Sequence, residues 1–83
     1  MKLSKYTKFR QEKFGGVLFE TRSEKVFSLN PTAAAVVSAI GSGDDERSII
    51  ERLKTRFDDR DGAIEREAIE FIAELRQKGL IED

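Results

Sequence analysis

Hydrophobic and polar residues alternate along the first third of the chain, whereas later apolar residues recur every three or four positions. Val17 and Phe19 share one face of an alternating segment, and Leu18 points to the other. Since side chains of a strand point alternately to its two faces, this alternation predicts strands joined by short polar turns. We expect a meander of three antiparallel strands with the third at an edge: residues 7–12, which hold one apolar side chain, residues 15–21 and residues 26–29.

The strands run directly into a segment that is apolar on almost every side. Asn30 is a favoured N-cap residue, and Pro31 is pre-organised for the first helical position. Alanine, valine and isoleucine fill most of residues 31–40, so we expect this segment to be the central buried helix. Gly41 and Gly43 are expected to end it.

Two amphipathic helices are predicted next. Ser48 and Glu51 have the spacing of a capping box, and the apolar stripe after them predicts a helix that ends at Phe57. Asp61 is the expected cap of a last helix over residues 62–78. The predicted core side of that helix consists of Ile64, Ala68, Phe71, Ile72 and Leu75.

The chain ends with a helix stop signal. Gly79 suits the left-handed position after a helix, and Leu80 lies where a Schellman motif would pack it against Leu75. The predicted order is β-β-β-α-α-α, an α+β fold that resembles a winged helix-turn-helix: a three-stranded antiparallel sheet followed by three helices. The length of 83 residues predicts a single domain, residues 1–83.

Composition argues against most catalytic and metal chemistry. The chain contains no Cys and no His, so thiolate ligands, disulfides and the commonest general base are missing. The pairs Asp44-Asp45 and Asp58-Asp59 lie in polar turns, where helix capping is the expected role. Gly15-Gly16 lacks the rest of a phosphate loop and is expected to mark a bulge or a close backbone approach. We therefore expect no enzyme activity, no metal and no cofactor.

No segment predicts targeting or membrane insertion. The sequence has no signal peptide, and no apolar run approaches the ~20 residues of a membrane span, so a cytoplasmic protein is expected. Five basic side chains lie near the start: Lys2, Lys5, Lys8, Arg10 and Lys13. They form either a basic arm that attracts an acidic partner or a solvated terminus.

Nucleic-acid binding is the alternative that the fold class raises. A DNA-binding helix should present an excess of basic and amide side chains, and the net charge here is only −1. The last helix instead mixes acidic and basic residues: Glu65, Glu67, Glu70 and Glu74 with Arg66, Arg76 and Lys78. A winged-helix transcription regulator remains the alternative hypothesis, and a scaffold subunit of a larger enzyme is a third.

An extended peptide is the partner that the predicted sheet suits best. The third strand contains Lys25 and Ser28 but no proline, so the N–H and C=O groups along its edge remain usable by an added strand. The alternative for Val26 and Ile69 is that both side chains complete the core.

Four segments resemble the PqqD family, and together they span roughly residues 9–81. They are Phe14–Glu20 (FGGVLFE), Phe27–Ala33 (FSLNPTA), Arg47–Leu53 (RSIIERL) and Phe71–Ile81 (FIAELRQKGLI). The opening FGxVL also resembles mycofactocin-type members. The pieces LNPTA and FxxxLxxxGL carry the resemblance most specifically.

The resemblance implies a peptide chaperone of the RiPP recognition element type. In that family the leader of a ribosomally synthesised precursor pairs with the third strand, lies against the third helix and is presented to a modifying enzyme, often a radical SAM protein. Partners would be a leader peptide and that enzyme, with no nucleic acid and no membrane. The matching site residues are Lys25, Val26, Phe27, Ser28 and Leu29 on the strand and Ile69, Ile72, Ala73 and Arg76 on the helix.

Overall fold

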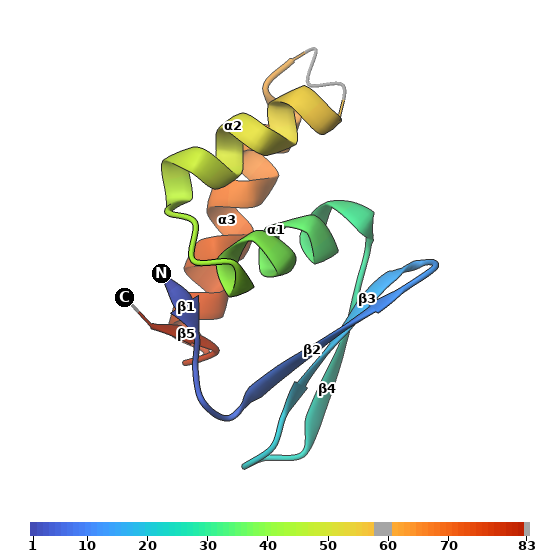
Figure 1. The fold of residues 1–83 in the computed structure, drawn as a ribbon, viewed down its shortest axis with the longest axis vertical. Helices are drawn as coiled ribbons and strands as arrows, with labels where there is room; N and C mark the ends of the chain where they lie inside the picture. The colour runs from blue at the N-terminus through green and yellow to red at the C-terminus, as the bar shows by residue number, and fades with distance from the viewer. Residues whose placement is uncertain (58–60, 83) are drawn as a thin grey trace.

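A three-stranded antiparallel sheet lies below three helices in the computed structural model, which describes residues 1–57 and 61–82 (Figure 1). The strand order is β2-β3-β4, so β4 is an edge strand as predicted. The bounds are β2 (Thr7–Glu12), β3 (Gly15–Glu20), β4 (Lys25–Leu29), α1 (Pro31–Gly41), α2 (Glu46–Arg56) and α3 (Ala63–Gln77). This order confirms the predicted α+β fold.

Two further strands were not predicted from the sequence. β1 (Lys2–Leu3) pairs antiparallel with β5 (Ile81–Glu82), which brings the two ends of the chain together (Figure 1). Lys2 and Glu82 also form an ion pair, with Nζ 3.6 Å from Oε1. Ser4 continues the contact, since its N–H donates to the Leu80 carbonyl at 2.9 Å.

The sheet packs one face against the helices. Leu18 is wholly buried, and the register places it opposite Phe9 on β2 and Phe27 on β4. Those three side chains therefore share the inner face, and Leu29 joins them near the end of β4. Strand β2 forms over the predicted residues although it holds a single apolar side chain, because its backbone pairs with β3 along its whole length and Phe9 packs against the core.

Helix α1 is the centre of the molecule, as its apolar sequence predicts. It touches all three strands of the sheet and both other helices. The Asn30 side-chain oxygen accepts a hydrogen bond from the Ala33 N–H at 2.8 Å, which confirms the predicted N-cap. Its buried residues are Ala34, Val36, Val37 and Ile40.

Helix α2 begins earlier than the capping-box pattern predicts. Its N-cap is Asp45, whose carboxylate accepts the Ser48 N–H at 2.8 Å, so Ser48 lies inside the helix and the Ser48–Glu51 box is wrong. Hydrogen bonds from the Ser48 N–H and then the Ser48 hydroxyl hold the pKa of Asp45 below its usual range. The earlier start adds a turn of helix before Ile49, which is wholly buried together with the nearly buried Leu53.

Helix α3 ends in the predicted Schellman motif. The Leu80 N–H donates to the Leu75 carbonyl at 2.9 Å, and the Gly79 N–H donates to the Arg76 carbonyl at 3.1 Å. Gly79 has φ 73°, a conformation that favours glycine. At the other end the N-cap is Gly62, so the prediction of Asp61 as the cap is wrong by one residue, although the Asp61 carboxylate accepts the Ala63 N–H at 3.2 Å. The Asp58-Asp59 pair lies outside the described residues.

The described residues offer no centre for a metal and no membrane span. Within residues 1–57 and 61–82, no group of three or more acidic side chains is arranged to hold an ion. Among the helices of that part, none is long and apolar enough to cross a membrane.

Candidate functional site

The outer edge of β4 is open in the part of the chain that the structure describes. β4 pairs with β3 on one side only, and the sheet ends there. Lys25, Val26 and Ser28 are exposed along this edge, with Val26 at 60% exposure. An unpaired strand edge is a template for a further strand.

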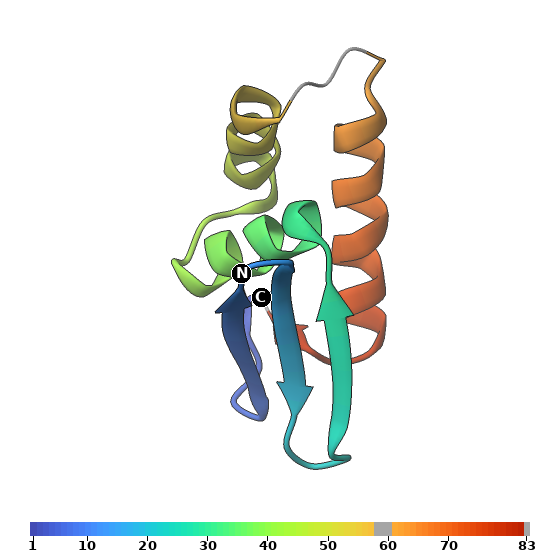
Figure 2. The ribbon, with the colours of Figure 1, turned by 90° about the vertical axis from the view of Figure 1, so that its right-hand side faces the viewer.

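Helix α3 lies beside β4 (Figure 2). Residues of both elements line a groove between them. The central cavity has a volume of about 240 Å³, far above the ~15 Å³ that one water needs, so it has room for side chains. Its β4 side is formed by Phe27, Ser28 and Leu29, and its α3 side by Phe71, Glu74, Leu75 and Lys78. The floor consists of Leu18, Asn30, Ala33 and Leu80.

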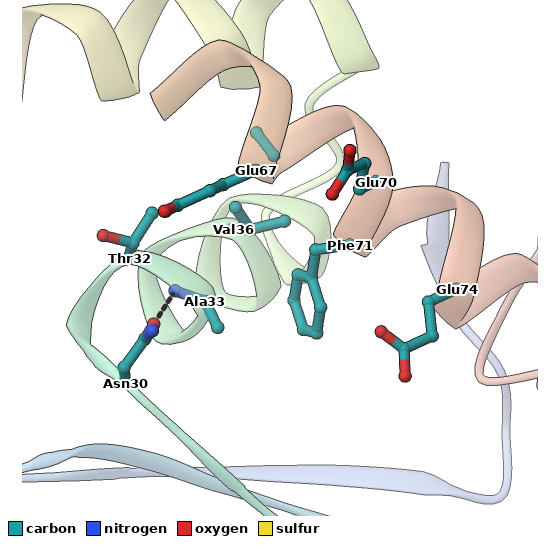
Figure 3. Close-up of a pocket in the computed structure, with 9 residues that line it drawn as sticks. Asn30, Thr32, Ala33, Val36, Glu67, Glu70, Phe71 and Glu74 are labelled. Carbon is teal, nitrogen blue, oxygen red and sulfur yellow. Dashed lines mark hydrogen bonds between the residues drawn. The ribbon is translucent and has the colours of Figure 1, made fainter. Parts of the chain in front are cut away.

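A second cavity of about 230 Å³ extends the groove past the end of β4. Figure 3 shows Glu67 extending from α3 toward Thr32, and the Phe71 ring projecting beside Ala33. Phe71 and Glu74 line both cavities, so the two adjoin. This second cavity is rich in carboxylates, which come from Glu67, Glu70 and Glu74.

A third cavity adjoins the groove at the start of β4. It shares Phe27, Lys78 and Leu80 with the central cavity and adds Arg22 and Lys25. The Lys78 ammonium lies 5.7 Å from the centre of the Phe27 ring and 3.5 Å from a Glu74 oxygen. The three cavities therefore follow β4 from one end to the other.

The turn before β4 is held by the Glu20 carboxylate. It accepts the Ser23 N–H at 2.7 Å, the Ser23 hydroxyl, and the Arg22 Nε–H at 3.0 Å. The Ser23 hydroxyl and then the Arg22 side chain lower the pKa of Glu20 to about 2. Glu20 pairs with Lys25 in the strand register, so this turn sets where β4 begins.

Two glycines of β3 allow close approaches, Gly15 to the end of β4 and Gly16 to β2. Gly15 has φ 142°, and a Cβ there would lie 2.1 Å from the Leu29 carbonyl oxygen. A Cβ on Gly16 would meet the Phe9 ring at 2.6 Å. The pairing of β2 with β3 continues through both glycines without an extra residue, so close approach is the correct interpretation and a bulge is wrong.

The predicted strand residues all lie at the groove or its edge. Phe27, Ser28 and Leu29 line the central cavity, although Leu29 is almost wholly buried. Lys25 lines the third cavity, and Val26 stays exposed on the outer face of the sheet, so it does not complete the core. What these residues bind remains a prediction.

The residues expected on the helix side lie elsewhere. Ile72 is wholly buried in the core, and none of the three cavities is lined by Ile69, Ala73 or Arg76. At about 100° per residue, these three fall on the opposite flank of α3 from Phe71. Ile69 is 45% exposed there, so it is not a core residue either. These residues therefore do not lie at the groove, and their contact with a peptide stays a prediction.

The helix face beside β4 is instead presented by Glu67, Phe71, Glu74 and Lys78. Sequence reasoning placed Phe71 in the core, but its ring is half-buried and lines two cavities. The sequence does contain a pattern that could have placed Phe71 at the groove. Phe71 lies at the border of the apolar stripe and shares its face with charged residues four before, three after and seven after it.

A small three-stranded sheet, backed by three helices and with a groove between its edge strand β4 and the last helix, defines a winged-helix-like α+β protein. The chain belongs to the PqqD family: the family model described as "Coenzyme PQQ synthesis protein D (PqqD)" matches residues 15–81. Among curated proteins, no match to the chain was found.

Two solved structures share this fold. One is described as "TbiB1 in Complex with the TbiA(beta) Leader Peptide", with a TM-score of 0.85 and 21% identity over 99% of this chain and 95% of that chain. The other is "Lasso peptide synthetase B1 complexed with the leader peptide", with a TM-score of 0.80 and 23% identity over 99% and 96%. At these identities the likeness concerns the fold.

Proposed function

We propose that this protein is a non-catalytic peptide chaperone, which binds the leader of a ribosomally synthesised precursor by strand addition to β4. The observation that carries the proposal is the open β4 edge beside a groove lined by Phe27 and Phe71. Main-chain hydrogen bonds from the edge would supply affinity, and the groove would supply specificity. The two solved structures described above are complexes with leader peptides, which supports the same assignment.

The chaperone would present the bound precursor to a modifying enzyme, and a radical SAM protein is the partner that PqqD-family membership favours. In this proposal residues 1–83 act as one recognition domain in the cytoplasm, where ribosomes release the precursor. Val26 and Ile69 are exposed and outside the groove, so an enzyme could contact them while the leader is bound.

Binding of the leader encoded beside this gene tests the proposal. We expect a Kd of micromolar or tighter in a calorimetric titration, as is usual for an extended peptide in a pre-formed groove. Duplex DNA serves as the comparison ligand, since a transcription regulator would bind it in a salt-dependent way. Failure of every neighbouring precursor to bind would overturn the proposal.

Amide hydrogen exchange locates the binding without a mutation. In an antiparallel sheet, alternate residues of an edge strand direct their N–H outward. We expect the leader to slow exchange at alternate amides of β4 and to leave the amides of β2 unchanged. Slowed exchange on β2 and not on β4 would place the peptide on the wrong edge.

A further inference from the structure

The groove carries opposite charges at its two ends. Glu67, Glu70 and Glu74 line the cavity beyond the end of β4. The cavity at its start is lined by three cations, Arg22, Lys25 and Lys78, and by one carboxylate, Glu20. The central cavity between them has the apolar side chains of Phe27, Leu29 and Phe71 on its walls, together with Glu74 and Lys78, which it shares with the two end cavities. The net charge of the chain is only −1, so this polarity belongs to the groove.

Several of these charges are free to meet a ligand. Within residues 1–57 and 61–82, Glu67 and Glu70 have no ion-pair partner, and the same holds for Lys25. Arg22 is engaged by Glu20 at 3.0 Å, so Lys25 and Lys78 are the cations that remain for a ligand at that end. Lys78 contacts Glu74 at 3.5 Å, an exposed pair of the kind that contributes little by itself.

The distance between the charged residues along α3 determines how far apart the matching residues of an added strand must be. Glu67 and Lys78 are separated by eleven helical steps, or about 16 Å at 1.5 Å per residue. Glu70 and Lys78 are separated by about 12 Å on the same basis. An extended peptide rises about 3.4 Å per residue, so these distances correspond to roughly four to five residues. Residues at i, i+2 and i+4 of a strand also share one face, which suits three side chains pointing toward α3.

The direction of the added strand follows from the sheet. All pairs in the sheet are antiparallel, and antiparallel pairing is slightly more stable per residue. An antiparallel peptide would begin beside Leu29, at the acidic end, and finish beside Lys25, at the basic end. A basic side chain would therefore come first and an acidic one last.

We propose that the groove selects a leader segment with the pattern basic-x-apolar-x-acidic, read from its N-terminus. The basic side chain would lie near Glu67 and Glu70, the apolar one between Phe27 and Phe71, and the acidic one near Lys25 and Lys78. This inference rests on the proposed function, because it assigns chemistry to the same groove. The proposed pattern follows from three features together: the cavities, the open edge of β4 and the opposite charges at the two ends of the groove.

Two synthetic peptides of one composition test the pattern. One contains lysine-threonine-leucine-threonine-aspartate between polar flanks, and the other exchanges the lysine and the aspartate. We expect the first to bind about tenfold tighter by fluorescence anisotropy at low salt. The preference should shrink at 0.5 M salt, where the Debye length falls to a few ångströms. Equal affinities, or a preference for the exchanged peptide, would overturn the inference.

Charge reversal of the protein gives the complementary test. The double variant Glu67→Lys/Glu70→Lys should reverse the preference between the two peptides, since both side chains are exposed and the fold should be retained. Lys8→Glu, a single charge reversal on β2 away from the groove, is the control, and it should leave the preference unchanged. Thermal unfolding checks that each variant folds.

The outcomes separate this inference from the proposed function. If the encoded leader binds β4 but neither synthetic peptide binds, the charge pattern is wrong and strand addition stands. If the encoded leader also fails to bind, both proposals fall. If Lys8→Glu changes the preference as much as the double variant does, the effect is one of overall charge and the assignment to the groove is wrong.

Discussion

The two edges of the sheet differ in what surrounds them, although each is a single strand paired to β3. β2 carries Lys8, Arg10 and Glu12, and Arg10 pairs with Glu12 at 3.1 Å. β4 has one charged residue, Lys25, and borders the groove against α3. Charged side chains are a usual device for protecting an edge from pairing, and β4 lacks most of it. An open edge therefore becomes a candidate site when its own residues leave it accessible and a neighbouring element adds side-chain pockets.

The largest effect is expected from a substitution in β3, the strand with which both edge strands pair. Leu18 is wholly buried in β3 between Phe9 and Phe27. Leu18→Ala should lower the free energy of unfolding by about 2–5 kcal/mol, because it leaves a cavity under the whole sheet. Urea unfolding measures this loss. A loss below about 1 kcal/mol would mean that the sheet does not depend on Leu18.

Phe71→Ala tests whether leader affinity depends on the groove in particular or on the stability of the whole sheet. Loss of the half-buried ring should lower the free energy of unfolding by about 1–3 kcal/mol. Leader affinity should fall at least tenfold, because the ring lines the groove. Phe9→Ala is the matched control, since Phe9 is also half-buried and packs against the core from β2. Calorimetry and thermal unfolding follow both variants. Equal loss of affinity in the two would remove the distinction between the edges.

A proline on each edge compares the edges directly. Ser28→Pro should weaken leader binding about tenfold or more, because proline removes an edge donor. Gln11→Pro on β2 should leave affinity unchanged. Gln11 pairs with Gly16 and Ser28 pairs with the next residue, Val17, so an outward N–H at Ser28 goes with an outward N–H at Gln11. Anisotropy titration measures affinity, and circular dichroism checks folding. If Ser28→Pro unfolds the chain, the Ser28 N–H of the native protein points toward β3. The leader must then slow amide exchange at Phe27 and not at Ser28. Unchanged affinity in a folded Ser28→Pro protein, with no protection at Phe27, would contradict strand addition at β4.

Acidification tests the turn that leads into β4. The pKa of Glu20 is about 2 in the folded protein, against an ordinary value of 4.5, so folding favours its charged form. The stabilisation from this carboxylate is complete above about pH 4.5 and is lost as pH falls toward 2. The unfolding midpoints of the native protein and of Glu20→Gln should therefore differ at pH 6 and converge near pH 2. A difference that persists at pH 2 would show that the charge of Glu20 is not its source.

The smallest expected effect concerns backbone strain in the same turn. Glu24 has φ 59°, a conformation that a residue other than glycine adopts at some cost. Glu24→Gly should raise the free energy of unfolding by up to about 1 kcal/mol, a shift of a few degrees in the unfolding midpoint. Glu24→Ala keeps the strain and serves as the control. A decrease in stability with glycine would mean that the Glu24 side chain stabilises the turn.

Local signals predicted the elements, whereas their packing decided the site. The Asn30-Pro31 start and the Gly79 stop were predictable because cap and helix are neighbours in sequence. The start of α2 was not, since Asp45 and Ser48 both suit a cap and the choice depends on burying Ile49. The pairing of β1 with β5 left no periodic pattern because each strand is only two residues long.

The helix side of the groove was missed for a related reason. Periodicity identifies the apolar stripe of α3, centred on Ile72, but the two flanks of that stripe look alike in sequence. Only the packing of α3 beside β4 shows that the flank with Phe71 faces the groove and the flank with Ile69 does not. Half-buried residues at the border of a stripe are thus the ones that sequence reasoning assigns least well.

Gly15 limits how this protein can change over evolutionary time. Any side chain at position 15 would collide with the Leu29 carbonyl and push the end of β4 out of place. The charged residues that line the groove, such as Glu67, Glu70 and Lys78, are exposed, and substitutions at exposed positions usually alter stability by less than about 0.5 kcal/mol. Preference for a new peptide could therefore drift rapidly by exchange of these side chains, while the glycine that positions the docking strand stays fixed.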